Sequence, residues 1–177
     1  MTTAKDESKK YPVCPEGTYP AVCIGVYDIG KQKTIFTNED GTPKVQHKVI
    51  IKFELDERMP EGEYKDKRYN VSKNYTLNLG EKSNLFRDLT SWLGKLSLEQ
   101  RKQGIELEGL IGKPCLITIG HNVKEDKTYT EIKAISRLVK GMNQIEQETD
   151  TTEIPNWIKK LQEQAVKNEV NGEEIPY

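Results

Sequence analysis

The stretch EKSNLFRDLTSWLG, residues 81–94, is the clearest helix signal in the chain and orders the segments around it. Ser83 is suited to cap the first turn, and Gly94 is suited to end the last one. Between them, apolar side chains recur at helical spacing and form a single stripe. The stripe consists of Leu85, Phe86, Leu89, Trp92 and Leu93. Because its two aromatic members share the stripe with three leucines, we expect the helix to pack into a core as scaffold.

Three strand-like segments precede this helix, and two strand-like segments follow it. The expected strands, typified by alternating apolar and polar side chains, are residues 18–29, 44–55, 64–79, 113–121 and 128–139. Ser97 and Gln100, at capping-box spacing, predict a short second helix over residues 98–103. Five strands with a helix between the third and the fourth are the layout of an OB-fold barrel. The expected fold class is therefore mainly β, with a five-stranded OB-fold barrel.

The alternation in the first expected strand predicts which side chains face the core, whereas the segment after it has two possible interpretations. In residues 18–29, the alternation places Val22, Ile24 and Val26 in the core and the intervening tyrosine and cysteine side chains outside. Residues 30–43, GKQKTIFTNEDGTP, combine lysines and a phenylalanine with an Asn-Glu-Asp-Gly turn. This segment is either a long flexible loop that closes over a ligand or an extension of a hairpin.

The second and third expected strands also carry face assignments. In residues 44–55 the odd-numbered apolar side chains are expected in the core, and His47 is expected beside them as a hydrogen-bonded structural residue. The lysines, Ile50 and Glu54 are expected on the outer face. In residues 64–79 two interpretations stay open: the tyrosines pack in the core, or a bulge brings them to the surface.

Composition narrows the class of protein. The chain has 177 residues, with 34% hydrophobic and 31% charged side chains and a mean hydropathy of -0.75. This length fits one domain with tails, and the polarity is typical of a soluble protein. No apolar run approaches the roughly 20 residues of a membrane span, and the first residues lack the apolar core of a secretory signal. We therefore expect a cytoplasmic location.

The cysteines and histidines offer no metal or disulfide pattern. Cys14, Cys23 and Cys115 are an odd number without paired spacing, and His47 and His121 lie far apart in the sequence. Structural thiols in a reducing compartment fit this pattern better than a disulfide framework or a zinc site. We expect no metal and no cofactor.

The chain divides by composition into three parts. Residues 1–13 are expected to be a disordered arm, residues 14–141 the OB-fold domain, and residues 142–177 an acidic tail. In this tail, a polar linker precedes a short amphipathic helix, residues 154–166, which docks either on the domain or on a partner. Beyond residue 140, three lysines face eight acidic residues, a net charge of -5 that leaves +4 for the rest. We expect the tail to compete with polyanions for the domain.

Motifs for catalysis are missing from the sequence. It contains no GxxxxGK[ST] phosphate loop, no GxSxG nucleophile elbow and no HExxH helix. Its acidic residues form no spaced set in an apolar setting of the kind that two-metal nucleases use. These absences favour a binding protein over an enzyme.

Lysines, arginines and aromatic residues alternate along the first three strands and the neighbouring loops. Binding of a single strand needs cations along the phosphates and aromatic faces on which bases stack. The candidate DNA-binding residues are Tyr27, Lys31, Lys33, Phe36, Lys48, Lys52, Arg68, Tyr69, Lys73, Tyr75, Lys127 and Tyr129. Packing in the core or at its rim is the alternative role for each tyrosine.

The last residues carry a sharper pattern. Glu173, Glu174, Ile175, Pro176 and Tyr177 resemble the acidic Ile-Pro-aromatic tip of bacterial single-stranded DNA-binding proteins, whose last residue is usually Phe. In that family the tip is a docking peptide for replication, repair and recombination proteins. The resemblance implies that the aromatic side chain fills an apolar pocket on the partner and that the carboxylates meet basic side chains.

The body resembles a different group, the phage-type single-strand binders with an OB-fold. The resemblance is carried by GTYPAVCIGVYDIG, KSNLFRDLTSWLG, LIGKPCLITIGHN and YTEIKAISRLVKG, and it covers residues 14–141. It implies a viral or prophage protein that coats and protects single-stranded DNA during replication and recombination in the host cytoplasm. An OB-fold module for protein interaction, an RNA-binding protein, and a small nuclease or nuclease inhibitor are the alternatives.

Overall fold

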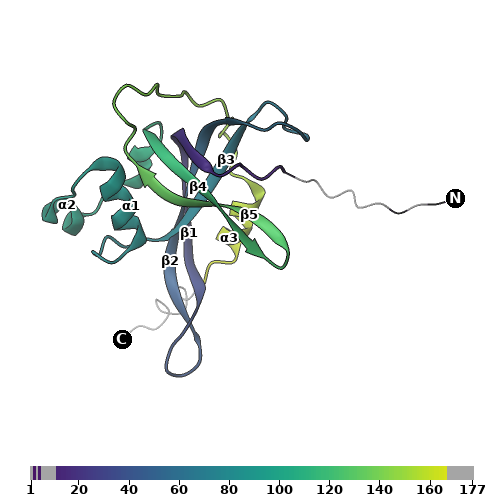
Figure 1. Ribbon diagram of the computed structural model, residues 1–177. Helices are drawn as coiled ribbons and strands as arrows, with labels where there is room; N and C mark the ends of the chain where they lie inside the picture. Colours follow the sequence, from purple (N-terminus) through teal and green to yellow (C-terminus); the bar gives the residue numbers. More distant parts are fainter. Residues whose placement is uncertain (1, 3, 5–10, 167–177) are drawn as a thin grey trace.

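The computed structural model describes residues 2, 4 and 11–166, and its centre is a five-stranded antiparallel sheet (Figure 1). The strands are β1 (Gly17–Thr37), β2 (Pro43–Arg58), β3 (Arg68–Thr76), β4 (Pro114–Lys124) and β5 (Lys127–Ser136). Their order across the sheet is β3-β2-β1-β4-β5. The edge strands β3 and β5 approach each other, but no backbone ladder joins them within the described residues. The mainly β prediction is confirmed, with a sheet that is not closed into a barrel.

The helices also follow the expected order. They are α1 (Asn84–Leu93), α2 (Leu98–Gln103), the 3-10 turn η1 (Leu107–Leu110) and α3 (Asn156–Glu163). The Ser83 hydroxyl accepts a hydrogen bond from the Phe86 backbone N–H, and the capping box of Ser97 and Gln100 is formed. Within the described residues, no helix is long and apolar enough to cross a membrane. The capping residues at Ser83, Ser97 and Gln100 were sufficient to locate α1 and α2 from the sequence.

Helix α1 covers one end of the core, as its apolar stripe predicts. Leu85, Leu89 and Trp92 are buried and pack in one cluster with β-strand residues that include Phe53. The Trp92 indole N–H donates a hydrogen bond of 2.8 Å to the backbone carbonyl of Pro114, at the start of β4. This bond satisfies the polar atom of a large buried ring. The helix is scaffold, as expected.

The odd-numbered tyrosines of β3 pack in the core, which decides between the two interpretations of that strand. Tyr69 and Tyr75 are 5% and 2% exposed. The Tyr75 hydroxyl donates a hydrogen bond of 2.7 Å to the buried Asp88 of α1, and the Lys73 ammonium donates another of the same length. One carboxylate therefore ties β3 to α1.

A bulge in β1 reverses the face assignment of its first half. Ala21 and Cys23, and not Val22 and Ile24, belong to the main core cluster. The register between β1 and β2 shifts between Cys23 and Gly25, and the extra residue moves the following side chains to the opposite face as far as the next shift, between Asp28 and Gly30. Val26 therefore packs against the core as predicted. Before the bulge, the prediction was wrong for Cys23, which lies in the main core, while Val22 and Ile24 are buried as expected but outside that cluster. Strict alternation does not reveal an inserted residue.

Residues 30–43 continue the hairpin, and the flexible-loop interpretation is wrong. Strands β1 and β2 stay paired as far as Thr37 and Pro43, which leaves only a short turn. Over residues 31–47 the two strands pair only with each other, and this ribbon, here called the arm, projects from the body (Figure 1).

Two residues of β2 differ from their predictions in burial. His47 keeps the parity of Val49 and Ile51, but it lies beyond the core, where it is exposed and makes a hydrogen bond of 2.7 Å with the Asp28 carboxylate. Glu54 lies on the outer face as expected, but its side chain is fully buried. Ile50, also on that face, is 2% exposed. Another part of the chain therefore covers the outer face.

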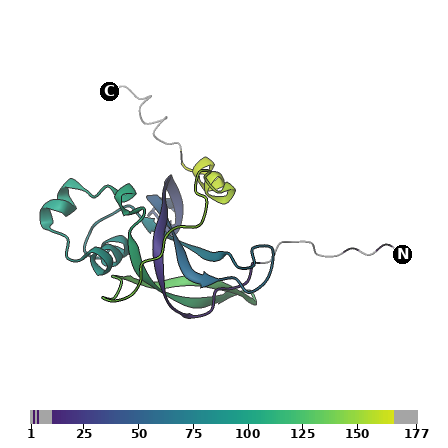
Figure 2. The ribbon, with the colours of Figure 1, turned by 90° about the horizontal axis from the view of Figure 1, so that it is seen from above.

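The cover is the C-terminal segment, residues 142–166, which returns across the sheet. Figures 1 and 2 show a long connection leading from β5 to α3, which lies beside the arm. Ile158 of α3 is fully buried and packs against Ile29 and Ile50. The backbone N–H of Val166 donates to the carbonyl of Lys31 at 2.7 Å. Of the two alternatives for the amphipathic helix, docking on the domain is the one observed.

Candidate nucleic-acid interface

A groove of about 670 Å³ lies between the outer edge of the sheet and the C-terminal segment. Its walls come from β2 and β3, from the connection between them, from the C-terminal segment and from the residues that precede β1. We call it the outer groove. Its aromatic and cationic lining residues are Tyr11, Lys52, Tyr64, Lys67, Arg68 and Trp157.

The aromatic residues of the outer groove present exposed ring faces. Tyr11 and Tyr64 stack with ring centroids 5.4 Å apart and an interplanar angle of 10°. They are 58% and 38% exposed, and Trp157 of α3 is 47% exposed. Tryptophan and tyrosine side chains with free ring area are the usual platforms for unpaired bases. The groove therefore offers stacking surfaces from three separate parts of the chain.

The cations of the outer groove come from the same surface. Lys52 points outward from β2 and makes no ion pair or hydrogen bond with any described residue, while burial lowers the pKa of its ammonium. Lys67, which also lines the groove, is exposed and lies just before β3. The half-buried ammonium has lost part of its hydration, and no anion within the described residues compensates for that loss. An anion bound at Lys52 would therefore meet a positive charge that is already partly desolvated.

Arg68 joins the sheet to the C-terminal segment. One of its terminal nitrogens donates to the buried Glu54 carboxylate at 3.1 Å and to the backbone carbonyl of Glu146 at 2.6 Å. Its Nε–H is buried and has no hydrogen-bond partner among the described residues. The guanidinium is therefore held in place at the groove with one donor still unused.

Glu54 fixes the C-terminal segment to the sheet. Its carboxylate accepts hydrogen bonds from the backbone N–H groups of Glu148 and Thr149, at 3.0 and 2.8 Å, and from the Thr149 hydroxyl. Burial alone would raise the pKa of Glu54, but the bonds from Thr149, Glu148 and Arg68 outweigh it and hold the pKa below its ordinary value. The ionised form of Glu54 is the one that binds the segment.

The side chain of Glu148 places a carboxylate at the groove. It accepts two hydrogen bonds from the two terminal nitrogens of Arg58, at 2.8 and 3.0 Å, and lies 3.5 Å from Arg68. A two-pronged contact of this kind suits a carboxylate or a phosphate equally well. Glu148 therefore occupies the position at which a phosphate would meet these two arginines.

Two of the twelve predicted DNA-binding residues, Lys52 and Arg68, line the outer groove. Tyr69 and Tyr75 are buried in the core and offer no ring face to a base. Lys73 is held by the Asp88 carboxylate. These three side chains have structural partners within the domain.

The other predicted residues lie at three places away from the groove. Tyr27 packs in the cluster that α3 covers, and the Lys48 ammonium donates to the Thr76 hydroxyl at 2.7 Å. The arm carries Lys31, Lys33 and Phe36, and the hairpin of β4 and β5 carries Lys127 and Tyr129. The predicted docking residues Glu173, Glu174, Ile175, Pro176 and Tyr177 lie outside the described residues.

The sequence analysis missed Tyr11, Tyr64, Lys67 and Trp157. Tyr11 lies in the expected disordered arm, and Tyr64 and Lys67 lie in a connection that the sequence assigned to the third strand, which begins only at Arg68. Trp157 lies in the expected amphipathic helix, residues 154–166. In the structure Ile158 is buried and Trp157 is not. The only signal in the sequence was an aromatic residue beside prolines or charges in a non-periodic segment.

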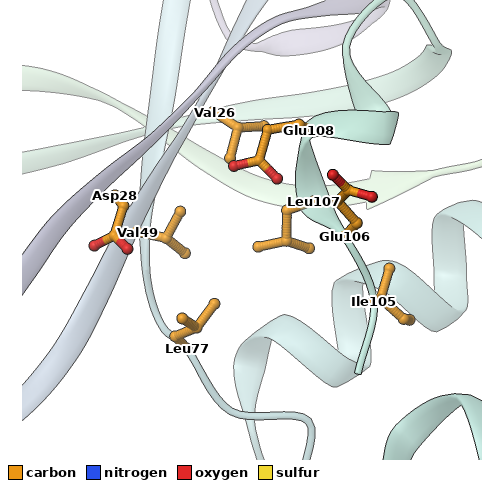
Figure 3. A pocket seen from close by; sticks show the side chains of 8 residues that line it. All are labelled: Val26, Asp28, Val49, Leu77, Ile105, Glu106, Leu107 and Glu108. Atoms are coloured by element: carbon orange, nitrogen blue, oxygen red, sulfur yellow. The ribbon is translucent and has the colours of Figure 1, made fainter. Parts of the chain in front are cut away.

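A second pocket, of about 150 Å³, opens on the opposite face of the β1–β2 ribbon, where η1 approaches the sheet (Figure 3). Val26, Val49 and Leu107 point toward its interior, and the carboxylates of Asp28, Glu106 and Glu108 lie around it. We call it the side pocket.

The described residues contain no cluster of three or more histidine, cysteine or acidic side chains that could hold a metal ion. The cysteines are free and buried, and burial raises the pKa of Cys14 to about 11 and that of Cys23 to about 12. Thiols with such pKa values stay protonated at neutral pH and are poor nucleophiles. The chemistry of the outer groove is that of aromatic stacking and cation–anion contact.

No protein-family model matches the chain, and no curated protein sequence matches it.

Proposed function

We propose that this protein is an OB-fold single-stranded DNA-binding protein of the phage type, without catalytic activity. The observation that carries the proposal is the outer groove, where exposed aromatic faces and cations lie together. An OB-fold assignment is supported by the strand order β3-β2-β1-β4-β5 and by α1 between β3 and β4. It is also supported by the approach of β3 to β5, the pair that would complete a barrel.

In this proposal the single strand lies along the outer groove. Bases stack on Tyr64 and Trp157, and phosphates contact Lys52, Lys67 and Arg68. Stacking contributes about 1–3 kcal/mol per base, and each cation adds a contact that salt weakens. Neither contact depends on base identity, so the protein coats DNA of any sequence.

The C-terminal segment is proposed to compete with DNA for the groove. Glu148 holds Arg58 in a two-pronged contact and lies near Arg68, so a phosphate must displace it to use these cations. The acidic tip is proposed to recruit replication, repair or recombination proteins, as the resemblance to bacterial single-stranded DNA-binding proteins implies.

Titration with oligo-dT tests the proposal directly. The chain has two tryptophans, Trp92 and Trp157, and Trp92 is buried. Quenching of tryptophan fluorescence by an oligo-dT of about 16 nucleotides should therefore come from Trp157. With three cations in contact with phosphates, log Kd should change with log salt concentration by a slope of about 2 in magnitude. Trp157→Phe should keep the binding and lose most of the quenching.

Each other outcome assigns a different function. No binding by fluorescence or by anisotropy of labelled DNA at low salt would overturn the proposal in favour of a protein-interaction module. Tighter binding of oligo-U than of oligo-dT would favour RNA. Cleavage of the labelled strand on addition of a divalent metal, or suppression of an added nuclease, would favour the nuclease-related alternatives.

A further inference from the structure

The arm exposes a group of apolar side chains that nothing in the described structure covers. Ile35 is 92% exposed, Phe36 is 61% exposed, and Val45 on the opposite strand is also exposed. Lys33 and Lys44 flank this group, and neither forms an ion pair with a described residue. A two-stranded ribbon without a covering layer is marginally stable, and an apolar group at its end marks a contact site.

The side pocket has the complementary chemistry. Its interior is apolar, and its volume of about 150 Å³ equals that of cavities that accommodate a benzene-sized group. Glu106 and Glu108, which lie beside the opening, form no ion pair with any described residue (Figure 3). An aromatic or branched side chain next to lysines would fill the interior and neutralise these carboxylates. Phe36, with Lys33 nearby, is such a side chain.

The geometry of the arm requires that the occupant come from another molecule. The side pocket lies at the base of the arm, since Asp28 of β1 and Val49 of β2 line it. Seven residues separate Asp28 from Ile35, and at about 3.3 Å per residue the apolar group lies roughly 23 Å away along an extended ribbon. The two strands of the arm pair as far as Lys33 and Val45 and again at Thr37 and Pro43, so the arm cannot fold back on its own base.

We propose that two copies of this chain associate through a twofold axis, with the apolar group of each arm in the side pocket of the other copy. When two arms lie antiparallel, the end of each one meets the base of the other, so a single arrangement makes both contacts. Such an interface is self-complementary and closes at the dimer. The inference does not depend on DNA binding, because the outer groove lies on the opposite face of the ribbon.

The experiment is sedimentation equilibrium of the full chain without DNA, from micromolar to several hundred micromolar protein. Wild type should form a concentration-dependent dimer. Variant A, Lys33→Glu with Lys44→Glu, and variant B, Glu106→Lys with Glu108→Lys, should each dimerise at least tenfold more weakly. In an equimolar mixture of A and B, both contacts again join opposite charges, so the dimer should return.

The control is Leu98→Asp, which changes an exposed apolar residue of α2 outside the arm and the pocket and should leave dimerisation unchanged. Ile35→Asp should weaken the dimer without altering the circular dichroism spectrum. A monomer at every concentration, open-ended growth beyond the dimer, or a mixture of A and B that stays monomeric would each overturn the inference. Failure of DNA binding in the oligo-dT titration would leave the dimer intact, so the two proposals are tested separately.

Discussion

Lys52 and Arg68 are the two cations that the sheet itself contributes to the outer groove, and they differ in what holds them. Arg68 is bonded to Glu54 and to the backbone of Glu146, whereas Lys52 has no anionic partner among the described residues. Removing the Lys52 charge therefore disturbs no internal contact. The residue reports on ligand binding without a confounding loss of stability.

We expect Lys52→Gln to weaken oligo-dT binding about tenfold and to lower the magnitude of the salt slope by about 1, because one phosphate contact is lost. Fluorescence titrations at several salt concentrations measure both quantities. The matched control is Lys102→Gln, on the exposed face of α2, which should change neither. An unchanged slope in Lys52→Gln would place the phosphates elsewhere.

Unlike Lys52, Asp88 is held by internal contacts, because the Lys73 ammonium and the Tyr75 hydroxyl both donate to its carboxylate. Asp88→Ala should lower the free energy of unfolding by about 3 kcal/mol, since it leaves the Tyr75 hydroxyl and the Lys73 ammonium without their acceptor. Urea denaturation measures the loss. Tyr75→Phe, which removes one donor and leaves the ion pair, should cost about 1 kcal/mol. Equal losses in the two variants would contradict the assignment.

At the scale of elements, the contact between β2 and the C-terminal segment is controlled by one ionisable group. The pKa of Glu54 is held below its ordinary value in the folded protein. The stabilisation that Glu54 provides is therefore fully present at any pH above the ordinary pKa of a glutamate. It is lost as the pH falls through the lowered pKa and the carboxylate becomes protonated. Acid should therefore release the segment from β2 before it unfolds the core.

The backbone amide resonances of Glu148 and Thr149 should follow this titration. We expect their chemical shifts to move together with a midpoint below pH 4.5, the ordinary value for a glutamate. In Glu54→Gln both amides should already be shifted at neutral pH, because the neutral amide is a weaker acceptor. A midpoint at or above the ordinary value would show that the contact does not favour the ionised form.

At the scale of the whole molecule, the C-terminal segment has two opposing roles. It contributes Trp157 to the outer groove, but it also places Glu148 against the arginines. The charge distribution alone suggests deletion of residues 142–177 as a test of competition. That deletion would remove both Trp157 and Glu148, and it would also uncover Glu54 and Ile50. A point substitution separates the roles.

Glu148→Gln should tighten oligo-dT binding about three- to tenfold at low salt, because Arg58 and Arg68 lose the carboxylate that competes with phosphate. The gain should shrink at high salt, where both contacts are screened. Anisotropy of labelled oligo-dT measures the affinity, and Glu153→Gln, in the same segment, is the control for net charge. Unchanged affinity in Glu148→Gln would exclude competition through this residue.

The sequence by itself determined the elements that depend on local chemistry. Capping at Ser83, Ser97 and Gln100 located α1 and α2, and two-residue alternation located all five strands. The apolar stripe of α1 was enough to assign Trp92 to the core, because the side of a helix that carries such a stripe packs against the core. These signals act over a few residues, so they can be read without knowledge of the fold.

Only the tertiary structure decided which residues face the outer groove. Register shifts after Cys23 and after Asp28 changed the faces of β1, since each inserted residue reverses the positions that follow it and leaves no mark in the alternation. Tyr11, Tyr64 and Trp157 come together from segments far apart in the chain, and none of them lies in a strand of the structure. The return of the C-terminal segment onto Glu54 and Ile50 depends on contacts across about a hundred residues. Local sequence carries no information about such contacts until the sheet exists to receive them.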